Sequence, residues 1–235
     1  PRDWWETLTK ALRGYSFRHG RLDVAFMTRY DSSGNPTMIA IIHVDDIMIA
    51  HDGSSESRRI VRQFVKDFTF GKWTNVCDQK EGVMYTGRNI KIVKGTEIHL
   101  SQTEYIDKME RGRFSKAPGR PNDDPADEQE HRLFRTLVGS LHWVTSQTRL
   151  DLAVDTSRLQ KCQNSPCYED LKDVDNIIKE LKSTSETAIR ILPVIDPVIA
   201  AYTDSALYGA RAEPIDRDED LKAYDKHKIY SQGGS

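Results

Sequence analysis

Hydrophobic positions in the first 50 residues change from helical spacing to strand-like spacing. Trp5, Leu8 and Leu12 recur three or four positions apart, which predicts a helix over residues 3–14. Three strands are expected after it, because the following apolar runs are alternating or continuous and the turn-forming sequence DSSGNP separates the first two; they cover residues 22–31, 37–44 and 47–50. The last two runs are so apolar that we expect this pair to be covered on both faces or to lie centrally in a sheet.

The hydrophobic period changes twice more before residue 110. Residues 54–71 place apolar side chains on one side of a helix. Residues 83–101 alternate again, and Lys94-Gly95 between two strand-like runs predicts a hairpin. A further helix is expected over SQTEYIDKMERGRF, residues 101–114, with Ser101 as its N-cap residue.

The second half of the chain is mainly helical until about residue 183. A loop rich in proline and acid, APGRPNDDPADEQE at 117–130, is the best candidate for a hinge or domain boundary. Three helices are expected, over residues 129–148, 150–163 and 167–183, and strand-like runs return at 186–194 and 198–206. Groups of strands and groups of helices that follow one another in this way predict an α+β fold.

Composition sets the class of protein but does not specify its chemistry. Hydrophobic residues make up 37% and charged residues 30%, enough to build a core in one large or two small domains. No apolar run is long enough to span a membrane, no secretion signal opens the chain, and a first residue other than Met leads us to expect a piece of a longer protein. Three cysteines, an odd number, favour plain thiols in a reducing compartment over disulfides or a metal site.

Charge is unevenly distributed along the chain. The net charge of −2 does not indicate a nucleic-acid-binding protein, but the first half is weakly basic and the second half acidic. The densest basic segment, RGRFSKAPGR, contains Arg111, Arg113, Lys116 and Arg120. Such a segment can neutralise phosphates, and the alternative is a solvated helix end with its loop.

Two adjacent acids, Asp45 and Asp46, interrupt the most apolar stretch of the sequence, MIAIIHVDDIMIAH. Ionised carboxylates are costly within a sheet, so we expect them at the bend of a hairpin whose strands are apolar. Neighbouring like charges raise each other's pKa unless a cation is present, and Mg²⁺ prefers hard oxygen ligands. The pattern predicts a metal-dependent nucleotidyl-transfer site, and the alternative is an ordinary turn.

Seven motifs occur in an order that resembles the reverse transcriptase of copia-type LTR retrotransposons. They are RDWWETLTKALRGYSF, DVAFM, HVDDIMIA, VMYTGRNIKI, HLSQTEYIDKM, FRTLVGSLHWVTSQTRLDLAVDTSRLQ and AYTDSAL. Each motif is weak by itself, and the order and spacing of all seven carry the resemblance. Together the motifs extend over essentially the whole chain.

The resemblance implies three parts of a polymerase polyprotein. These are the C-terminal part of a right-hand palm over 1–95, thumb and connector helices over 96–185, and the start of an RNase H-like domain over 186–235. The implied activity is RNA-directed DNA polymerisation with Mg²⁺ or Mn²⁺, on an RNA or DNA template–primer duplex and dNTP. The implied location is intracellular, in the cytoplasm (as virus-like particles) or the nucleus, with no membrane partner; the oligomeric state is left open.

Candidate site residues follow from the resemblance position by position. Asp45 and Asp46 would be catalytic metal ligands, and Asp204 would be the first metal-binding acid of RNase H. The resemblance places Tyr85, Gly87 and Gln102 in contact with nucleic acid, and the basic segment described above adds Arg111, Arg113 and Lys116.

The sequence also departs from the family pattern. Reverse transcriptases need another Asp from an earlier strand, and Asp23 lies too late in the motif order to be that residue. We therefore expect the fingers and the first half of the palm to be absent. His43 stands where Tyr or Phe is usual, and either fills that space or titrates near the metals. Two interpretations stay open: a polymerase segment that is inactive alone, or a non-catalytic nucleic-acid-binding remnant.

Overall fold

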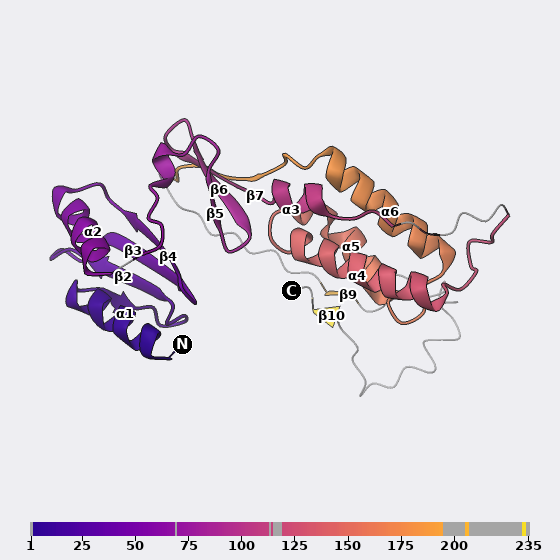
Figure 1. The fold of residues 1–235 in the computed structure, drawn as a ribbon, viewed down its shortest axis with the longest axis horizontal. Helices are drawn as coiled ribbons and strands as arrows, with labels where there is room; N and C mark the ends of the chain where they lie inside the picture. The colour runs from indigo at the N-terminus through magenta and orange to yellow at the C-terminus, as the bar shows by residue number, and fades with distance from the viewer. Residues whose placement is uncertain are drawn as a thin grey trace. The chain divides into compact units, whose positions relative to one another are not determined.

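The computed structural model describes residues 2–68, 70–112, 114, 119–194, 205–206 and 232–233 (Figure 1). These residues form six α-helices and two four-stranded antiparallel sheets, which confirms the mixed α+β class. The chain divides into two compact units: unit 1 is Pro1–Tyr105 with Ala188–Ile191, and unit 2 is Ile106–Thr187 with Leu192–Ser235. Within the described ranges, no helix is both long enough and apolar enough to cross a membrane.

The first sheet of unit 1 has the strand order β1-β2-β3-β4, and each neighbouring pair is antiparallel. Its strands are β1 (Arg18–His19), β2 (Phe26–Tyr30), β3 (Pro36–His43) and β4 (Asp46–His51). The three predicted strands are confirmed, and β1 is an addition. β3 lies inside the sheet as expected. The same expectation is wrong for β4, which is an edge strand whose central apolar residues are only half-buried.

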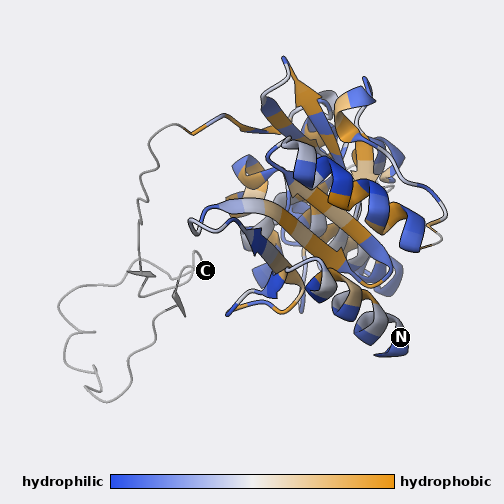
Figure 2. Cartoon of the chain, turned by 90° about the vertical axis from the view of Figure 1, so that its left-hand side faces the viewer, coloured by the Kyte–Doolittle hydropathy of each residue, from blue (hydrophilic) through white to orange (hydrophobic). Residues whose placement is uncertain are grey.

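Two helices, α1 (Arg2–Gly14) and α2 (Ser55–Asp67), pack on one face of this sheet. Both were predicted, and α2 begins at the Ser54 N-cap, whose hydroxyl accepts a hydrogen bond from the Ser57 amide at 3.2 Å. Helices and strands share one core, formed by Leu8, Leu12, Phe17, Met27, Met38, Ala40, Ile42, Ile60 and Phe64. In Figure 2 the strands are largely in the hydrophobic colour, while the helices carry hydrophilic turns on their outer sides.

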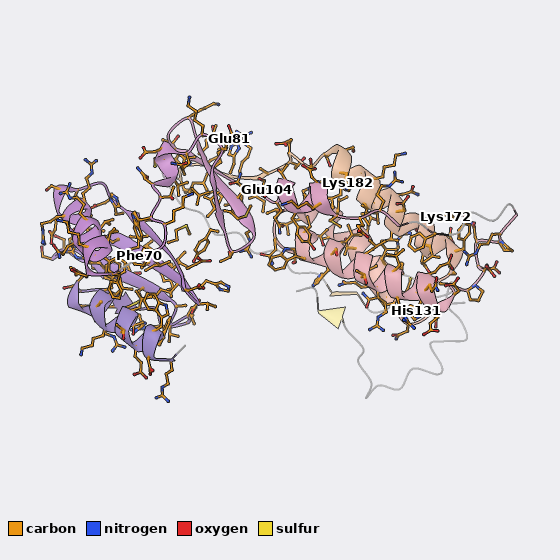
Figure 3. The ribbon with its side chains drawn as sticks, in the orientation of Figure 1. Phe70, Glu81, Glu104, His131, Lys172 and Lys182 are labelled. Atoms are coloured by element: carbon orange, nitrogen blue, oxygen red, sulfur yellow. The ribbon has the colours of Figure 1, made fainter. Side chains whose placement is uncertain are left out.

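Aromatic side chains close the end of this core after α2. Phe70, labelled in Figure 3, lies 5.4 Å from Phe64 and 5.2 Å from Trp73 between ring centroids. Phe68 contacts the same cluster and meets Trp4 of α1 edge-on at 5.9 Å. Edge-to-face pairs of this kind add to the stabilisation from buried area, so the cluster joins the start of α1 to the end of α2.

The second sheet of unit 1 has the order β5-β6-β7-β8 and follows a short 3₁₀ turn, η1 (Val76–Asp78). Its strands are β5 (Val83–Tyr85), β6 (Arg88–Val93), β7 (Glu97–Ser101) and β8 (Ile189–Ile191). The predicted hairpin at Lys94-Gly95 is confirmed, with φ of 51° and 76° at these residues. β8 returns to β7 from a distant part of the sequence, and Arg190 forms an ion pair with Glu97 at 3.1 Å across that junction.

Helix α3 (Thr103–Lys108) follows β7 and is shorter than expected. The prediction of Ser101 as its N-cap is wrong, because Ser101 is the last residue of β7 and pairs with Asn89 of β6. The strand thus continues to the position at which the helix was expected to begin. Gln102, between the two elements, is buried.

Unit 2 contains the three predicted helices, α4 (Glu128–Thr145), α5 (Ala153–Lys161, preceded by the 3₁₀ turn η2, Leu150–Leu152) and α6 (Tyr168–Ser183). A capping box at Asp127 and Glu130 starts α4. The helices enclose a core that also includes Ile106 and Met109, and whose largest members are Phe134, Leu141, Leu159, Leu171 and Ile178. Lys182 near the end of α6 (Figure 3) donates to the Asp107 carbonyl at 2.7 Å.

Little of the segment after residue 194 falls within the described residues. β9 (Ser205–Ala206) pairs antiparallel with β10 (Gln232–Gly233). Of the run predicted as a strand over 198–206, only these last two residues are described. The remainder, including Asp204, lies outside the described residues.

Candidate metal centre at the Asp45–Asp46 hairpin

The two adjacent acids lie at the bend of a tight hairpin, as the sequence predicted. β3 ends at His43 and β4 begins at Asp46, so the turn consists of Val44 and Asp45 alone. His43 and Asp46 form the last cross-strand pair before this turn. Both carboxyl-bearing residues are exposed, which removes the cost that burial of two ionised groups would carry.

The alternation of side chains along the strands decides which face carries Asp46. Ile42 pairs with Ile47, and both contact the core beneath the helices. Successive residues of a strand point to opposite faces, so the next pair, His43 and Asp46, lies on the face away from α1 and α2. Neither Asp45 nor Asp46 has a side-chain hydrogen bond or ion pair to the part of the chain that the structure describes.

The turn is strained at Val44. Its φ is +55°, in the left-handed region that β-branched residues rarely adopt. The other two tight turns of unit 1 also have a non-glycine residue in this region at the first position, Thr86 (φ 48°) and Lys94 (φ 51°), but each is followed by a glycine, Gly87 (φ 79°) or Gly95 (φ 76°), which the Val44 turn lacks. A non-glycine residue held there costs about 1–3 kcal/mol, and such strain collects at functional sites.

Two side chains from distant parts of unit 1 hold the backbone of this hairpin. The indole Nε1 of Trp4 donates to the Val44 carbonyl at 3.1 Å, and the Tyr85 hydroxyl donates to the Ile41 carbonyl at 3.2 Å. Burial raises the pKa of Tyr85, and the negative charge of Asp46 raises it further. The phenol of Tyr85 therefore lies close enough to Asp46 for the carboxylate charge to affect its ionisation.

The donor set at the tip fits a hard divalent cation. Carboxylate oxygens are the ligands that Mg²⁺ and Mn²⁺ prefer, and Mg²⁺ is commonly held by one or two carboxylates plus substrate phosphates. Asp45 and Asp46 supply these two carboxylates, exposed and adjacent. Across the described residues, no group of three or more His, Cys, Asp or Glu side chains is placed to hold a metal ion. The hairpin is thus a partial ligand set that leaves positions for other oxygens.

The remaining predicted residues of unit 1 lie at separate places. Tyr85 is the last residue of β5, and Gly87 lies in the turn between β5 and β6. The hydrogen bond to Ile41 places Tyr85 near the hairpin. Gln102 has only 1% of its surface exposed. Asp23, which the motif order excluded as a ligand, accepts a hydrogen bond from the Ala25 amide at 2.8 Å and so stabilises its own turn.

The basic segment is partly neutralised by the chain itself. Arg111 forms two hydrogen bonds to the Asp175 carboxylate, at 3.1 and 2.6 Å, which hold the pKa of the guanidinium above its usual value. Arg120 pairs with Asp124 and Glu130, each at 2.6 Å, and lies over the Tyr168 ring. Arg113 and Lys116 lie outside the described residues, as does Asp204. Arg111 and Arg120, the described cations of this segment, are therefore both paired with acids of the chain itself.

Trp4 is the residue of the hairpin region that sequence reasoning did not assign to the site. Its apolar spacing fits a helix that packs on a core, and nothing in that spacing indicates a hydrogen bond to a residue 40 positions later. The run of two adjacent tryptophans was the one available signal. The helix turns Trp5 away from the hairpin, to stack on His19 at 6.4 Å.

No protein-family model and no solved structure matches the chain.

Proposed function

We propose that this chain forms part of an RNA-directed DNA polymerase of the copia retrotransposon type, and that Asp45 and Asp46 hold its catalytic Mg²⁺ or Mn²⁺. The observation that carries the proposal is the pair of exposed carboxylates, without a partner among the described residues, at the tip of a hairpin that Trp4 and Tyr85 hold in place. The order of the seven sequence motifs supports it.

The carboxylates of Asp45 and Asp46 would act as ligands and not as proton carriers. A divalent cation bound there would supply positive charge against the phosphate oxygens of an incoming dNTP. Each carboxylate extends from a rigid two-stranded element, which limits the freedom lost when it binds. The template–primer duplex would approach the sheet face that carries Asp46, opposite the two helices.

A third acid is needed to complete a polymerase site of this type. The resemblance to copia-type enzymes implies that it comes from an earlier strand than Asp23. The 235-residue chain alone would then bind the cation weakly and would not extend a primer. Full activity would belong to a parent polypeptide in which the earlier strand meets the hairpin.

The first test measures Mn²⁺ binding by the full 235-residue chain. Mn²⁺ titration followed by electron paramagnetic resonance should give a dissociation constant that Asp45→Asn or Asp46→Asn weakens about tenfold, or about 1.4 kcal/mol. Glu81→Gln, which changes an exposed acid of the same unit, serves as the matched control and should leave binding unchanged. Equal affinities for all four proteins would refute the metal assignment.

The second test measures primer extension. Asp45→Ala in a parent polypeptide that supplies the earlier strand should abolish product, and unchanged product would contradict a catalytic role. The isolated chain should give no extension with Mg²⁺ or Mn²⁺. If it binds duplex in a salt-sensitive way but holds no Mn²⁺ at Asp45 and Asp46, the non-catalytic binding interpretation replaces the enzyme interpretation.

A further inference from the structure

The turn at Val44 needs an explanation beyond the length of the hairpin. A two-residue connection between antiparallel strands usually has glycine or asparagine where φ is positive. Here a valine with 72% of its surface exposed occupies that position. Burial of its side chain therefore does little to compensate for its backbone conformation. Neither of its two residues is a glycine, unlike the turns at Thr86-Gly87 and Lys94-Gly95, so a contact from outside the turn is the remaining source of support to consider.

Trp4 provides that contact. Its indole N–H reaches the carbonyl of Val44 itself, the residue immediately before Asp45. The indole is fixed in turn, because Trp4 packs against the unit 1 core and meets Phe68 edge-on. The hydrogen bond thus joins a rigid support to the one strained peptide of the tip.

We propose that Trp4 is a positioning residue, which holds the Val44 carbonyl so that Asp45 is presented in one direction next to Asp46. This inference rests on the proposed function only for its consequence, which is metal affinity. The order of the turn itself is a separate, measurable property.

Tyr85 supports the same hairpin at a different place. Its hydroxyl donates to Ile41, two residues before the end of β3, and so fixes the strand but not the turn. Loss of Trp4 should therefore loosen residues 44–46 while the earlier part of β3 keeps its pairing. This localisation separates a positioning role from a general loss of stability.

The experiment compares Trp4→Phe with Trp5→Phe in the full chain. Phenylalanine keeps a ring in the core but removes the N–H donor together with part of the indole ring. Trp5 is the neighbouring indole on the same helix, so Trp5→Phe controls for the loss of ring atoms. Amide hydrogen exchange at Asp46 should quicken about fivefold in Trp4→Phe, the effect expected for one hydrogen bond of typical strength. Trp5→Phe should leave it unchanged.

The same Trp4→Phe change is also tested in the Val44→Gly variant, in which the turn should no longer depend on the indole. Glycine adopts a positive φ without steric cost, so the turn no longer needs the indole. In that background Trp4→Phe should change Asp46 exchange by about twofold or less, a non-additive result that only coupled residues give. An equal effect in both backgrounds, or no effect of Trp4→Phe in the Val44 protein, would overturn the proposal.

Mn²⁺ binding then separates the two proposals. If both stand, Trp4→Phe weakens Mn²⁺ binding by about the same fivefold, and Trp5→Phe does not. If the unaltered chain binds no Mn²⁺ at the hairpin, the proposed function fails while the exchange data still decide the role of Trp4. If Mn²⁺ binds but Trp4→Phe leaves the exchange rate at Asp46 unchanged, the positioning role of Trp4 is refuted and the proposed function is not.

Discussion

Charged groups have opposite environments at two places in the molecule, one in each unit. In unit 2, Arg149 has 2% of its surface exposed, forms two-pronged hydrogen bonds to Asp151, and donates to the Thr184 carbonyl at 3.2 Å. In unit 1, Asp45 and Asp46 are exposed and have no partner in the described residues. The Arg149 guanidinium is buried with its hydrogen bonds satisfied, whereas the two carboxylates of unit 1 are exposed to solvent without a partner among the described residues.

The difference shows which charges serve stability. Buried charges are tolerated only when hydrogen-bonded partners satisfy them, as the Arg149 network does. An open pair of like charges beside a strained peptide contributes nothing to the fold. Residues that are present although they lower the stability of the fold are candidates for binding a ligand.

Replacement of Arg149 by methionine should have the largest effect on stability. It removes one of two donors to the Thr184 carbonyl, which keeps the Thr187 amide at 3.0 Å, and it leaves Asp151 without its cation; because Asp151 is half-exposed, water recovers part of the loss. We expect a decrease of about 2–3 kcal/mol in the free energy of unfolding, measured by urea denaturation.

The matched control is Arg132→Met, in the exposed pair between Arg132 and Glu128 of α4. That change should cost less than about 0.5 kcal/mol. Equal losses in the two variants would mean that burial does not distinguish these arginines, and the contrast between the units would lose its basis.

Val44→Gly should act in the opposite direction on unit 1. Relief of a positive φ returns about 1–3 kcal/mol, and the added freedom of glycine in the unfolded chain takes back about 0.5–1 kcal/mol. We expect a net stabilisation of about 1 kcal/mol by urea denaturation. Destabilisation would show that the turn is unstrained, and that the cost assigned to the tip is absent.

The secondary structure around these two charged sites was predictable from the sequence. The hairpin at 45–46 follows from apolar runs that border two acids, and the helices of unit 2 follow from their apolar spacing. These signals are short-range: side chains only a few residues apart decide them. The turn at Lys94-Gly95 was found for the same reason.

Contacts between distant residues were not predictable. β8 joins β7 through residues 93 positions apart, and Trp4 reaches Val44 across 40. Periodicity indicates that each segment is a strand or helix but does not specify its partner. The edge position of β4 was missed similarly, since an apolar run does not reveal whether a further strand follows. The pairing of Arg111 with Asp175, 64 residues away, is a third case.

An alkaline transition tests a hydrogen bond of unit 1 in which the Tyr15 phenol, just after α1, donates to the Asp67 carboxylate of α2. Burial and the Asp67 carboxylate raise the pKa of Tyr15 to about 12, so its phenol stays protonated in the fold when an unfolded chain would lose the proton near pH 10. The contribution is complete below pH 10 and is lost as the pH rises toward 12. Urea denaturation at several pH values should show a smaller alkaline loss for Tyr15→Phe than for the unaltered chain. Parallel curves would contradict a contribution of this hydrogen bond.

The smallest effect on stability belongs to the hairpin carboxylates themselves. Asp45→Asn and Asp46→Asn each remove one of two like charges, break no described hydrogen bond and keep the side-chain volume. We expect the free energy of unfolding to change by less than about 0.5 kcal/mol, and in the stabilising direction, because repulsion between the neighbours is relieved. Urea denaturation at low and at high salt checks this, since screening should abolish any gain. A loss above about 1 kcal/mol would mean that the carboxylates support the turn, and their exposure would no longer point to a ligand. A neutral result combined with lost Mn²⁺ binding would separate function from folding at these two residues, as the open arrangement of the tip requires.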